Sequence, residues 1–125
     1  MITGSHVVLF SSNADADRTF LRDVLEFPFV DAGHGWLIFK LPPAEIAVHP
    51  TGGDSTPSHA TDAMLNAEFY LMCDDLRATI KALAAKNVTC TAIDQARWGM
   101  KTTIRLPSGG TIGLYQPTHP IALQL

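Results

Sequence analysis

The sequence predicts an α+β fold made of two copies of one module, in which a strand and a helix are followed by further strands. Three features of the 125-residue chain lead to this prediction. The stretch "RLPSGGTIGLYQP" repeats the pattern of "KLPPAEIAVHP", with a basic residue, Leu-Pro, a short turn and a strand pattern. Upstream of each stretch lie a β-rich run and a segment with apolar residues at helical spacing. A polar segment rich in Gly, Pro, Ser and Thr separates the two copies.

The first copy is expected to begin with a strand over "HVVLF", residues 6–10. "SSN" then offers helix N-cap residues, and "ADADRTFLRDVLEF" has the helical period. Its apolar face is formed by Phe20, Leu21, Val24 and Leu25. Pro and Gly in "FPFVDAGHG" end the helix. Two strands, "WLIFKL" and "EIAVH" (residues 45–49), follow across the turn "PPA", and "PFVDAG" is a candidate extra strand.

The second copy repeats this order after the polar segment. "EFYLMC", residues 68–73, reads as a strand, and "DDLRATIKALAAKN" reads as a helix with acidic residues in its first turn. "VTCTAI", residues 88–93, is a short strand candidate, and "MKTTIRL" with "TIGLYQ" forms a hairpin across "PSGG". The sequence therefore predicts a single domain over 1–125, with module 1 at about 4–50, a linker loop at 51–66 and module 2 at about 67–118.

The composition and charge of the chain limit the partners and the cellular compartment that we expect for it. The net charge is −3 and no basic cluster is present, so we expect no nucleic-acid partner. No apolar run is long enough to span a membrane, and "MITGSHVVLF" lacks the features of a signal peptide. Cys73 and Cys90 are too few and too widely spaced for a disulfide framework. These features favour a cytoplasmic protein with reduced thiols.

The tandem modules resemble the vicinal oxygen chelate superfamily, which includes glyoxalase I, bleomycin-resistance proteins, fosfomycin-resistance proteins and extradiol dioxygenases. The resemblance is carried by "SHVVLFSSNADADRTFLRDVLEFPFV", "EFYLMCDDLRATIKALAAKNV" and "RLPSGGTIGLYQP". It implies two tandem βαβββ modules, whose mixed sheet curls into a cup with helices outside, and it implies a homodimer. In metal-dependent members, four side chains facing into the cup, two from each module, hold a divalent ion.

Strand alternation assigns side chains to the cup face or the helix face. With Val7, Leu9, Phe69, Leu71, Ile112 and Leu114 toward the helices, the four ligand positions of the family fall on His6, Ala47, Glu68 and Gly113. Only His6 and Glu68 can bind a metal. His49 lies two residues beyond Ala47, roughly 6–7 Å along a strand, so it would join such a site only if the strand were shifted.

The resulting candidate site has metal and ligand-binding positions. The metal candidates are His6 and Glu68, and Glu68 is also the candidate catalytic residue, as a metal ligand or general base. The ligand-binding candidates are His6, His49, Tyr70, Arg105 and Tyr115. His6 and Glu68 are equally open to pairing with each other. Trp36 and Trp98 could each stack on a ligand, but core or dimer packing is favoured for both. No role is assigned to His34, His59 or His119.

Three function classes remain open. The favoured interpretation is binding of a small organic molecule in the cup without a complete metal site, since Ala47 and Gly113 would leave volume for a ligand. The alternative is a divalent-metal-dependent lyase, isomerase or dioxygenase acting on a small oxygen-bearing substrate. A scaffold protein with a closed cup ranks third. The cofactor is therefore none or a divalent metal of unknown identity, and enzyme activity stays an open question.

Overall fold

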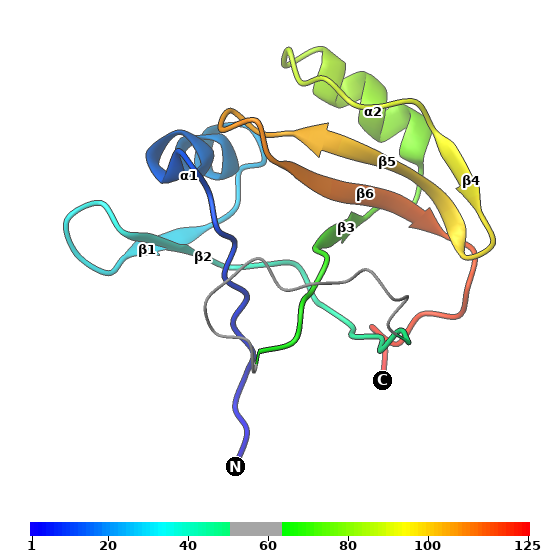
Figure 1. Ribbon diagram of the computed structural model, residues 1–125, viewed down its shortest axis with the longest axis horizontal. Helices are drawn as coiled ribbons and strands as arrows, with labels where there is room; N and C mark the ends of the chain where they lie inside the picture. Colours follow the sequence, from blue (N-terminus) through cyan, green and yellow to red (C-terminus); the bar gives the residue numbers. More distant parts are fainter. Residues whose placement is uncertain (51–63) are drawn as a thin grey trace. The chain divides into compact units, whose positions relative to one another are not determined.

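The computed structural model of the chain describes residues 1–50 and 64–125 (Figure 1). Most of the expected linker, His59 included, lies outside the described residues. The chain divides into two compact units. Unit 1 comprises Met1–Leu41 with Arg105–Thr111, and unit 2 comprises Pro42–Ile104 with Ile112–Leu125. None of the helices in the described parts is long and apolar enough to cross a lipid bilayer.

Unit 1 contains the helix α1, Ala14–Asp23, as the apolar period predicts. Asn13 caps it, because its side-chain oxygen accepts a hydrogen bond from the backbone nitrogen of Ala16 at 3.2 Å. The side chain of Phe20, on the apolar side of the helix, is buried. The helix ends earlier than the sequence pattern suggests, since Glu26 has a positive φ of 58° that an α-helix cannot accommodate.

The expected extra strand in "PFVDAG" is confirmed as β1, Phe29–Asp31. It pairs antiparallel with β2, Leu37–Phe39, so that Val30 lies opposite Ile38. The turn between them passes through three residues with positive φ, Gly33, His34 and Gly35. The carboxylate of Asp31 accepts a hydrogen bond from the backbone nitrogen of Gly33 at 2.7 Å, which stabilises the turn.

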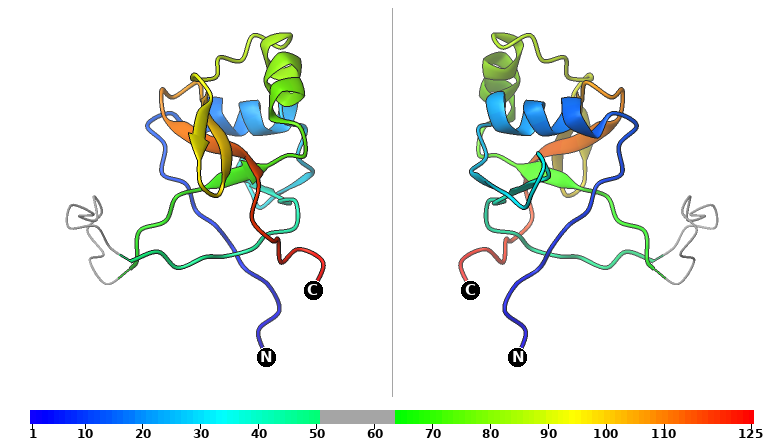
Figure 2. Two further views of the ribbon diagram at one scale, coloured as in Figure 1. Left: turned by 90° about the vertical axis from the view of Figure 1, so that its right-hand side faces the viewer. Right: turned by 90° about the vertical axis from the view of Figure 1, so that its left-hand side faces the viewer.

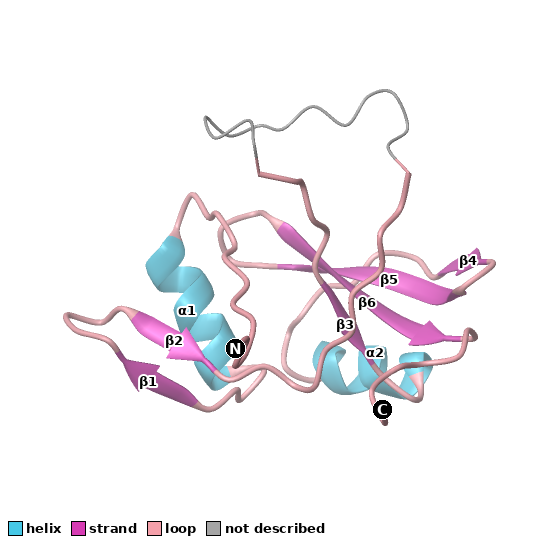
Figure 3. Cartoon of the chain, turned by 90° about the horizontal axis from the view of Figure 1, so that it is seen from below, coloured by secondary structure: helices cyan, strands magenta, loops and turns pink. Residues whose placement is uncertain are grey.

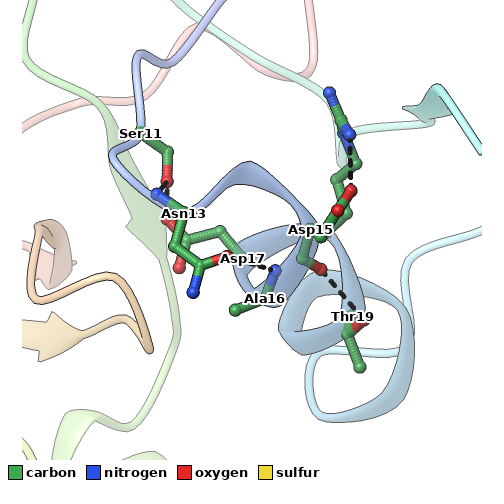
Figure 4. A network of polar contacts seen from close by, with 7 residues as sticks. Ser11, Asn13, Asp15, Ala16, Asp17 and Thr19 are labelled. Carbon is green, nitrogen blue, oxygen red and sulfur yellow. Dashed lines mark hydrogen bonds and ion pairs between the residues drawn. The ribbon is translucent and has the colours of Figure 1, made fainter.

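A buried carboxylate fixes the Leu106–Gly110 turn within unit 1. Asp17 is only 7% exposed. It accepts a hydrogen bond from the hydroxyl of Ser11 at 2.6 Å and from the backbone nitrogen of Ser108 at 3.0 Å. Figure 4 shows Ser11 and Asn13 converging on the first turn of α1 beside Asp17. The "LPSGG" turn is therefore held by a side chain that lies some 90 residues earlier.

Two of the strands expected from the sequence are wrong. Neither residues 6–10 nor residues 45–49 belong to any of the six strands of the described chain, and Figure 2 shows the N-terminal segment in dark blue as an extended run. Ile46 and Val48 are 92% and 90% exposed. Apolar and β-branched residues supply strand propensity, but a strand forms only where a neighbouring strand satisfies its backbone groups.

Unit 2 is built on a sheet with the order β3-β6-β5-β4 (Figure 3). Its strands are β3, Tyr70–Met72; β4, Asp94–Ala96; β5, Gly99–Arg105; and β6, Thr111–Pro117, with the ends Arg105 and Thr111 grouped in unit 1. β3 runs parallel to β6, and β4 runs antiparallel to β5. The predicted hairpin of β5 and β6 is confirmed.

The strand expected over 88–93 is reduced to an isolated bridge between Cys90 and Ile104. β4 forms instead at Asp94–Ala96, a segment without β-branched or aromatic residues and therefore of low strand propensity. Pairing decides this outcome, because the two-residue turn before Gly99 sets β4 directly against β5.

The helix α2, Leu76–Ala84, lies on one face of this sheet (Figures 1 and 2). Asp75 caps it through the backbone nitrogen of Ala78. The side-chain oxygen of Gln116, in β6, accepts a hydrogen bond from the backbone nitrogen of Leu76 at 2.9 Å. Ile112 and Leu114 alternate with Gln116 toward the same buried face, as predicted. The buried apolar residues on this side form the core of unit 2: Leu76, Leu83, Val88, Ile104, Ile112 and Leu114.

Candidate functional site

The opposite face of the unit 2 sheet carries four rings, Tyr70, Trp98, Tyr115 and His119, which we call the aromatic cluster. The centroid of Trp98 lies 5.7 Å from that of Tyr70 and 4.9 Å from that of Tyr115. The two tyrosine rings are 5.6 Å apart. All three pairs are close to perpendicular, at 80–84°, which is the edge-to-face geometry that aromatic quadrupoles favour. His119 lies 6.0 Å from Tyr115.

Strand pairing and one glycine position Tyr70. The β3–β6 register sets Tyr70 against Gly113 and Met72 against Tyr115. A Cβ on Gly113 would collide with the ring of Tyr70, so this ring lies directly over the glycine. The alternation argument is therefore confirmed for these residues, which share one face. The idea that Gly113 leaves open volume is wrong, because Tyr70 fills it.

Both phenols of the cluster are held in hydrogen bonds. The hydroxyl of Tyr70 donates to a carboxylate oxygen of Glu68 at 2.6 Å. This hydrogen bond, with burial and the negative charge of Glu68, raises the pKa of Tyr70 to about 12. Burial, with the nearby carboxylate of Glu45, also raises the pKa of Tyr115. Both phenols therefore keep their protons at neutral pH and act as hydrogen-bond donors.

His119 has its tautomer set by its neighbours. Its Nδ1 lies 2.7 Å from the carbonyl oxygen of Pro120, which can only accept a hydrogen bond, so Nδ1 carries the proton. Its Nε2 lies 3.1 Å from the hydroxyl of Tyr115. With the proton on Nδ1, Nε2 is the atom that accepts the hydrogen bond of the Tyr115 hydroxyl, and the contact orients the Tyr115 ring.

Charged groups flank the aromatic cluster. The ammonium group of Lys101 lies 5.4 Å from the centre of the Trp98 ring, within the range of a cation–π contact. Its distance to the carboxylate of Asp94 is 3.9 Å, which is a loose ion pair. The carboxylate of Glu45 accepts a hydrogen bond from the backbone nitrogen of Ala122. A ligand on these rings would meet a cation beside Trp98 and a carboxylate beside Tyr70.

The structure brings together three of the predicted site residues, Glu68, Tyr70 and Tyr115. His49 belongs to the same unit, where its Nδ1 lies 2.7 Å from the carbonyl oxygen of Pro50 and its side chain is exposed. His6 and Arg105 belong to unit 1, and both are exposed. The predicted set is thus divided between the two units.

Sequence reasoning assigned no role to His119, and for Trp98 it favoured core or dimer packing over stacking on a ligand. The backbone nitrogen of Thr118 donates to the carbonyl oxygen of Trp98 at 3.0 Å, which sets the start of β5 beside the end of β6. This long-range pairing brings both rings next to Tyr115, and the local sequence carries no signal of it.

The residues present do not fit the four-ligand metal site that the resemblance implies. Ala47 offers a methyl group, and the space over Gly113 is filled by the Tyr70 ring. One carboxylate oxygen of Glu68 already accepts the proton of Tyr70. Among residues 1–50 and 64–125, no three His, Cys, Asp or Glu side chains are grouped as a metal site would require.

Several solved structures are similar to this chain in fold. A lactoylglutathione lyase from Agrobacterium tumefaciens matches with a TM-score of 0.61 and 19% identity, covering 91% of this chain and 92% of that one. TnmS3, an antibiotic-binding protein from Streptomyces sp. CB03234, matches at 0.58 and 23%, covering 94% and 100%. A glyoxalase/bleomycin resistance protein from the same strain matches at 0.53 and 21%, covering 85% and 93%.

Neither a sequence model of a protein family nor a curated protein sequence matches the chain. Identities of 19–23% establish a common fold and leave the chemistry open. The chain therefore has the glyoxalase/bleomycin-resistance fold, which is the fold of the vicinal oxygen chelate superfamily.

Proposed function

We propose that the protein binds a small planar organic molecule on the aromatic cluster, without a complete metal site. The observation that carries this proposal is the Tyr70 ring, which occupies the sheet face where a metal ligand at position 113 would stand. Tyr70 and Trp98 are half-buried, so their rings retain surface for a ligand, whereas Tyr115 is buried beneath them. Rings of this kind supply large apolar contact area at low entropic cost.

The chemistry around the rings supports an aromatic ligand. A planar ring that contacts Tyr70 and Trp98 gains about 0.5–1.5 kcal/mol per aromatic pair beyond the burial of apolar area. Lys101 beside Trp98 favours a carboxylate or phenolate substituent, and the Glu68 carboxylate favours a hydrogen-bond donor. TnmS3, an antibiotic-binding protein with the same fold, further supports a binding role.

The alternative is a divalent-metal-dependent lyase, isomerase or dioxygenase acting on a small oxygen-bearing substrate. The match to a lactoylglutathione lyase favours it at the level of fold. The donor set counts against it, since only His6 and Glu68 offer ligand atoms at the expected positions. Metal content of the purified protein decides between the two. Near-stoichiometric metal that is lost in Glu68→Ala would make the alternative the leading function.

Binding is best tested by titration calorimetry with three probes that share the naphthalene ring and differ in the charge of the substituent: 2-naphthol, 2-naphthoate and 2-naphthylmethylammonium. We expect at least one probe to bind, and Trp98→Leu to weaken its affinity about 10-fold, the loss of one aromatic contact. Trp36→Leu is the matched control, because Trp36 is 61% exposed and belongs to unit 1. No binding by any probe, or equal losses in both variants, would contradict the proposal.

We also propose that the protein works in the cytoplasm. Cys73 and Cys90 are both free thiols. Burial raises the pKa of each thiol, so neither is poised as a reactive thiolate. Fractionation of the source cells checks this location, and recovery of the protein from a secreted fraction would contradict it.

A further inference from the structure

Three side chains from neighbouring strands form a row across the unit 2 sheet, on the face of the aromatic cluster. The β4–β5 register sets Asp94 opposite Lys101. A Cβ on Gly99 would approach the Cα of Pro117 to 3.1 Å, so these two residues are opposite each other in the β5–β6 hairpin. Two residues further along this hairpin, Lys101 is therefore opposite Tyr115. Opposite residues share a face of the sheet, so Lys101 stands between the buried Tyr115 and the exposed Asp94.

The positive charge of Lys101 is available to a ligand. Among the described residues, its closest anionic group is the Asp94 carboxylate, at 3.9 Å, which is too long for a hydrogen bond. The Asp94 side chain is 68% exposed, so water screens this ion pair. The Trp98 ring attracts the charge but offers no oxygen to the three N–H donors of the ammonium group. A carboxylate that replaces Asp94 can therefore gain hydrogen bonds that Asp94 does not make.

The carboxylates on the other side of the aromatic cluster are bound more tightly within the protein. Glu68 accepts the hydrogen bond of the Tyr70 hydroxyl at 2.6 Å. Glu45 accepts a hydrogen bond from the backbone nitrogen of Ala122 at 3.1 Å. A cationic ligand would compete with these hydrogen bonds, whereas an anionic ligand displaces only the loosely held Asp94. The arrangement of charges therefore favours an anion.

We propose that the ligand of the aromatic cluster is an aromatic acid, whose carboxylate binds the ammonium group of Lys101 in place of Asp94. The inference rests on the proposed function and specifies its ligand class, with Lys101 as the residue that determines specificity. The ring system of the ligand contacts Tyr70 and Trp98. Tyr70 lies on β3 and Lys101 on β5, two strand spacings or roughly 10 Å apart. Two fused rings suit this span better than a single ring.

The test compares 2-naphthoate with 2-naphthol, which has the same rings and no charge at pH 7, by titration calorimetry. We expect 2-naphthoate to bind at least about 10-fold more tightly, since a hydrogen bond to a charged group contributes that much. Lys101→Met keeps the unbranched side chain, removes the charge and should abolish this preference without changing the affinity for 2-naphthol. Lys101→Arg keeps the charge and should retain the preference.

The matched control is Lys81→Met, which removes one positive charge from an exposed position of α2, on the opposite side of the sheet. It should leave the preference for 2-naphthoate unchanged. Circular dichroism checks that each variant is folded. Equal loss of the preference in Lys81→Met and Lys101→Met would assign the effect to net charge and overturn the role of Lys101.

Asp94→Asn tests the displacement. It removes the competing charge and keeps the shape of the side chain, so 2-naphthoate should bind about 2- to 5-fold more tightly, the range that an exposed ion pair allows. Added salt should weaken the binding of 2-naphthoate and leave that of 2-naphthol unchanged. Weaker binding of 2-naphthoate to Asp94→Asn would show that Asp94 assists the ligand, against the inference.

Nuclear Overhauser effects test the orientation of bound 2-naphthoate. We expect contacts between the Lys101 side chain and the ring protons next to the carboxylate, and between Tyr70 and the distant ring. The reverse orientation would overturn the inference. So would equal affinity for 2-naphthoate and 2-naphthol, or a preference for 2-naphthylmethylammonium, and in both cases the aromatic binding site itself would stand. No binding by any of the three probes would overturn the proposed function together with this inference.

Discussion

Replacing Gly113 with alanine tests whether Tyr70 occupies the second-module ligand position. The new methyl group would collide with the Tyr70 ring, and pairing with β3 fixes the backbone of β6. The ring must therefore leave its place. Its departure breaks the hydrogen bond to Glu68 and the edge-to-face contacts with Trp98 and Tyr115.

The expected loss follows from these contacts. A hydrogen bond to a charged group contributes about 1.5–3 kcal/mol, and the exposure of Glu68 favours the lower end of that range. Each aromatic pair contributes about 0.5–1.5 kcal/mol. The displaced ring regains some contacts elsewhere, so Gly113→Ala should lower the free energy of unfolding by about 2–3 kcal/mol, as overpacked sites do.

Denaturant unfolding monitored by circular dichroism measures this loss. Gly110→Ala is the control, because a Cβ at Gly110 meets only the Ser108 hydroxyl oxygen, at an ordinary 3.5 Å. It should change the free energy of unfolding by no more than about 0.5 kcal/mol. In a Tyr70→Ala background, Gly113→Ala should cost little, since the colliding ring is gone. An equal cost in both backgrounds would refute the reasoning.

Two further predictions concern buried or paired polar groups. In a Tyr115→Phe background, absorbance titration should show Tyr70 ionising near pH 12, and Glu68→Gln should bring this pKa back toward 10. Because the folded state holds the Tyr70 proton more tightly than the unfolded state, the stabilisation is fully present below about pH 10 and is lost as the pH rises toward 12. Asp17→Ala should lower the free energy of unfolding by about 1–3 kcal/mol, since it leaves two hydrogen-bond donors without their acceptor. Asp15→Ala, at a side chain 95% exposed, should cost under about 1 kcal/mol in the same unfolding assay, and equal costs would contradict the role of Asp17.

Local sequence was sufficient for the elements that rest on short-range rules. The helix α1 begins at an expected cap residue, because the side-chain oxygen of Asn13 accepts a hydrogen bond from the backbone nitrogen of Ala16. The helix α2 begins two residues later than expected, since Asp75 is its cap and no acidic residue lies in its first turn. The β5–β6 hairpin also forms as expected, because the short turn "PSGG" joins its two strands. The repeated Leu-Pro turn led to the fold class, and the similar solved structures have that fold.

Elements that depend on distant partners were less predictable. Residues 6–10 and 45–49 have strand propensity, yet a strand exists only when another backbone lies beside it. β4 shows the converse, because Asp94–Ala96 has low propensity and pairs with β5 all the same. Propensity is a property of the segment, whereas pairing is a property of the whole arrangement.

The same distinction between local sequence and long-range pairing applies to the candidate site. The sequence by itself determined the fold class, the shared face of Glu68, Tyr70 and Tyr115, and the lack of ligand atoms at Ala47 and Gly113. Only the tertiary structure placed the Tyr70 ring over Gly113 and joined Trp98 and His119 to Tyr115. The physical reason is that alternation fixes the face on which a side chain lies, but the register between strands decides which side chains meet there.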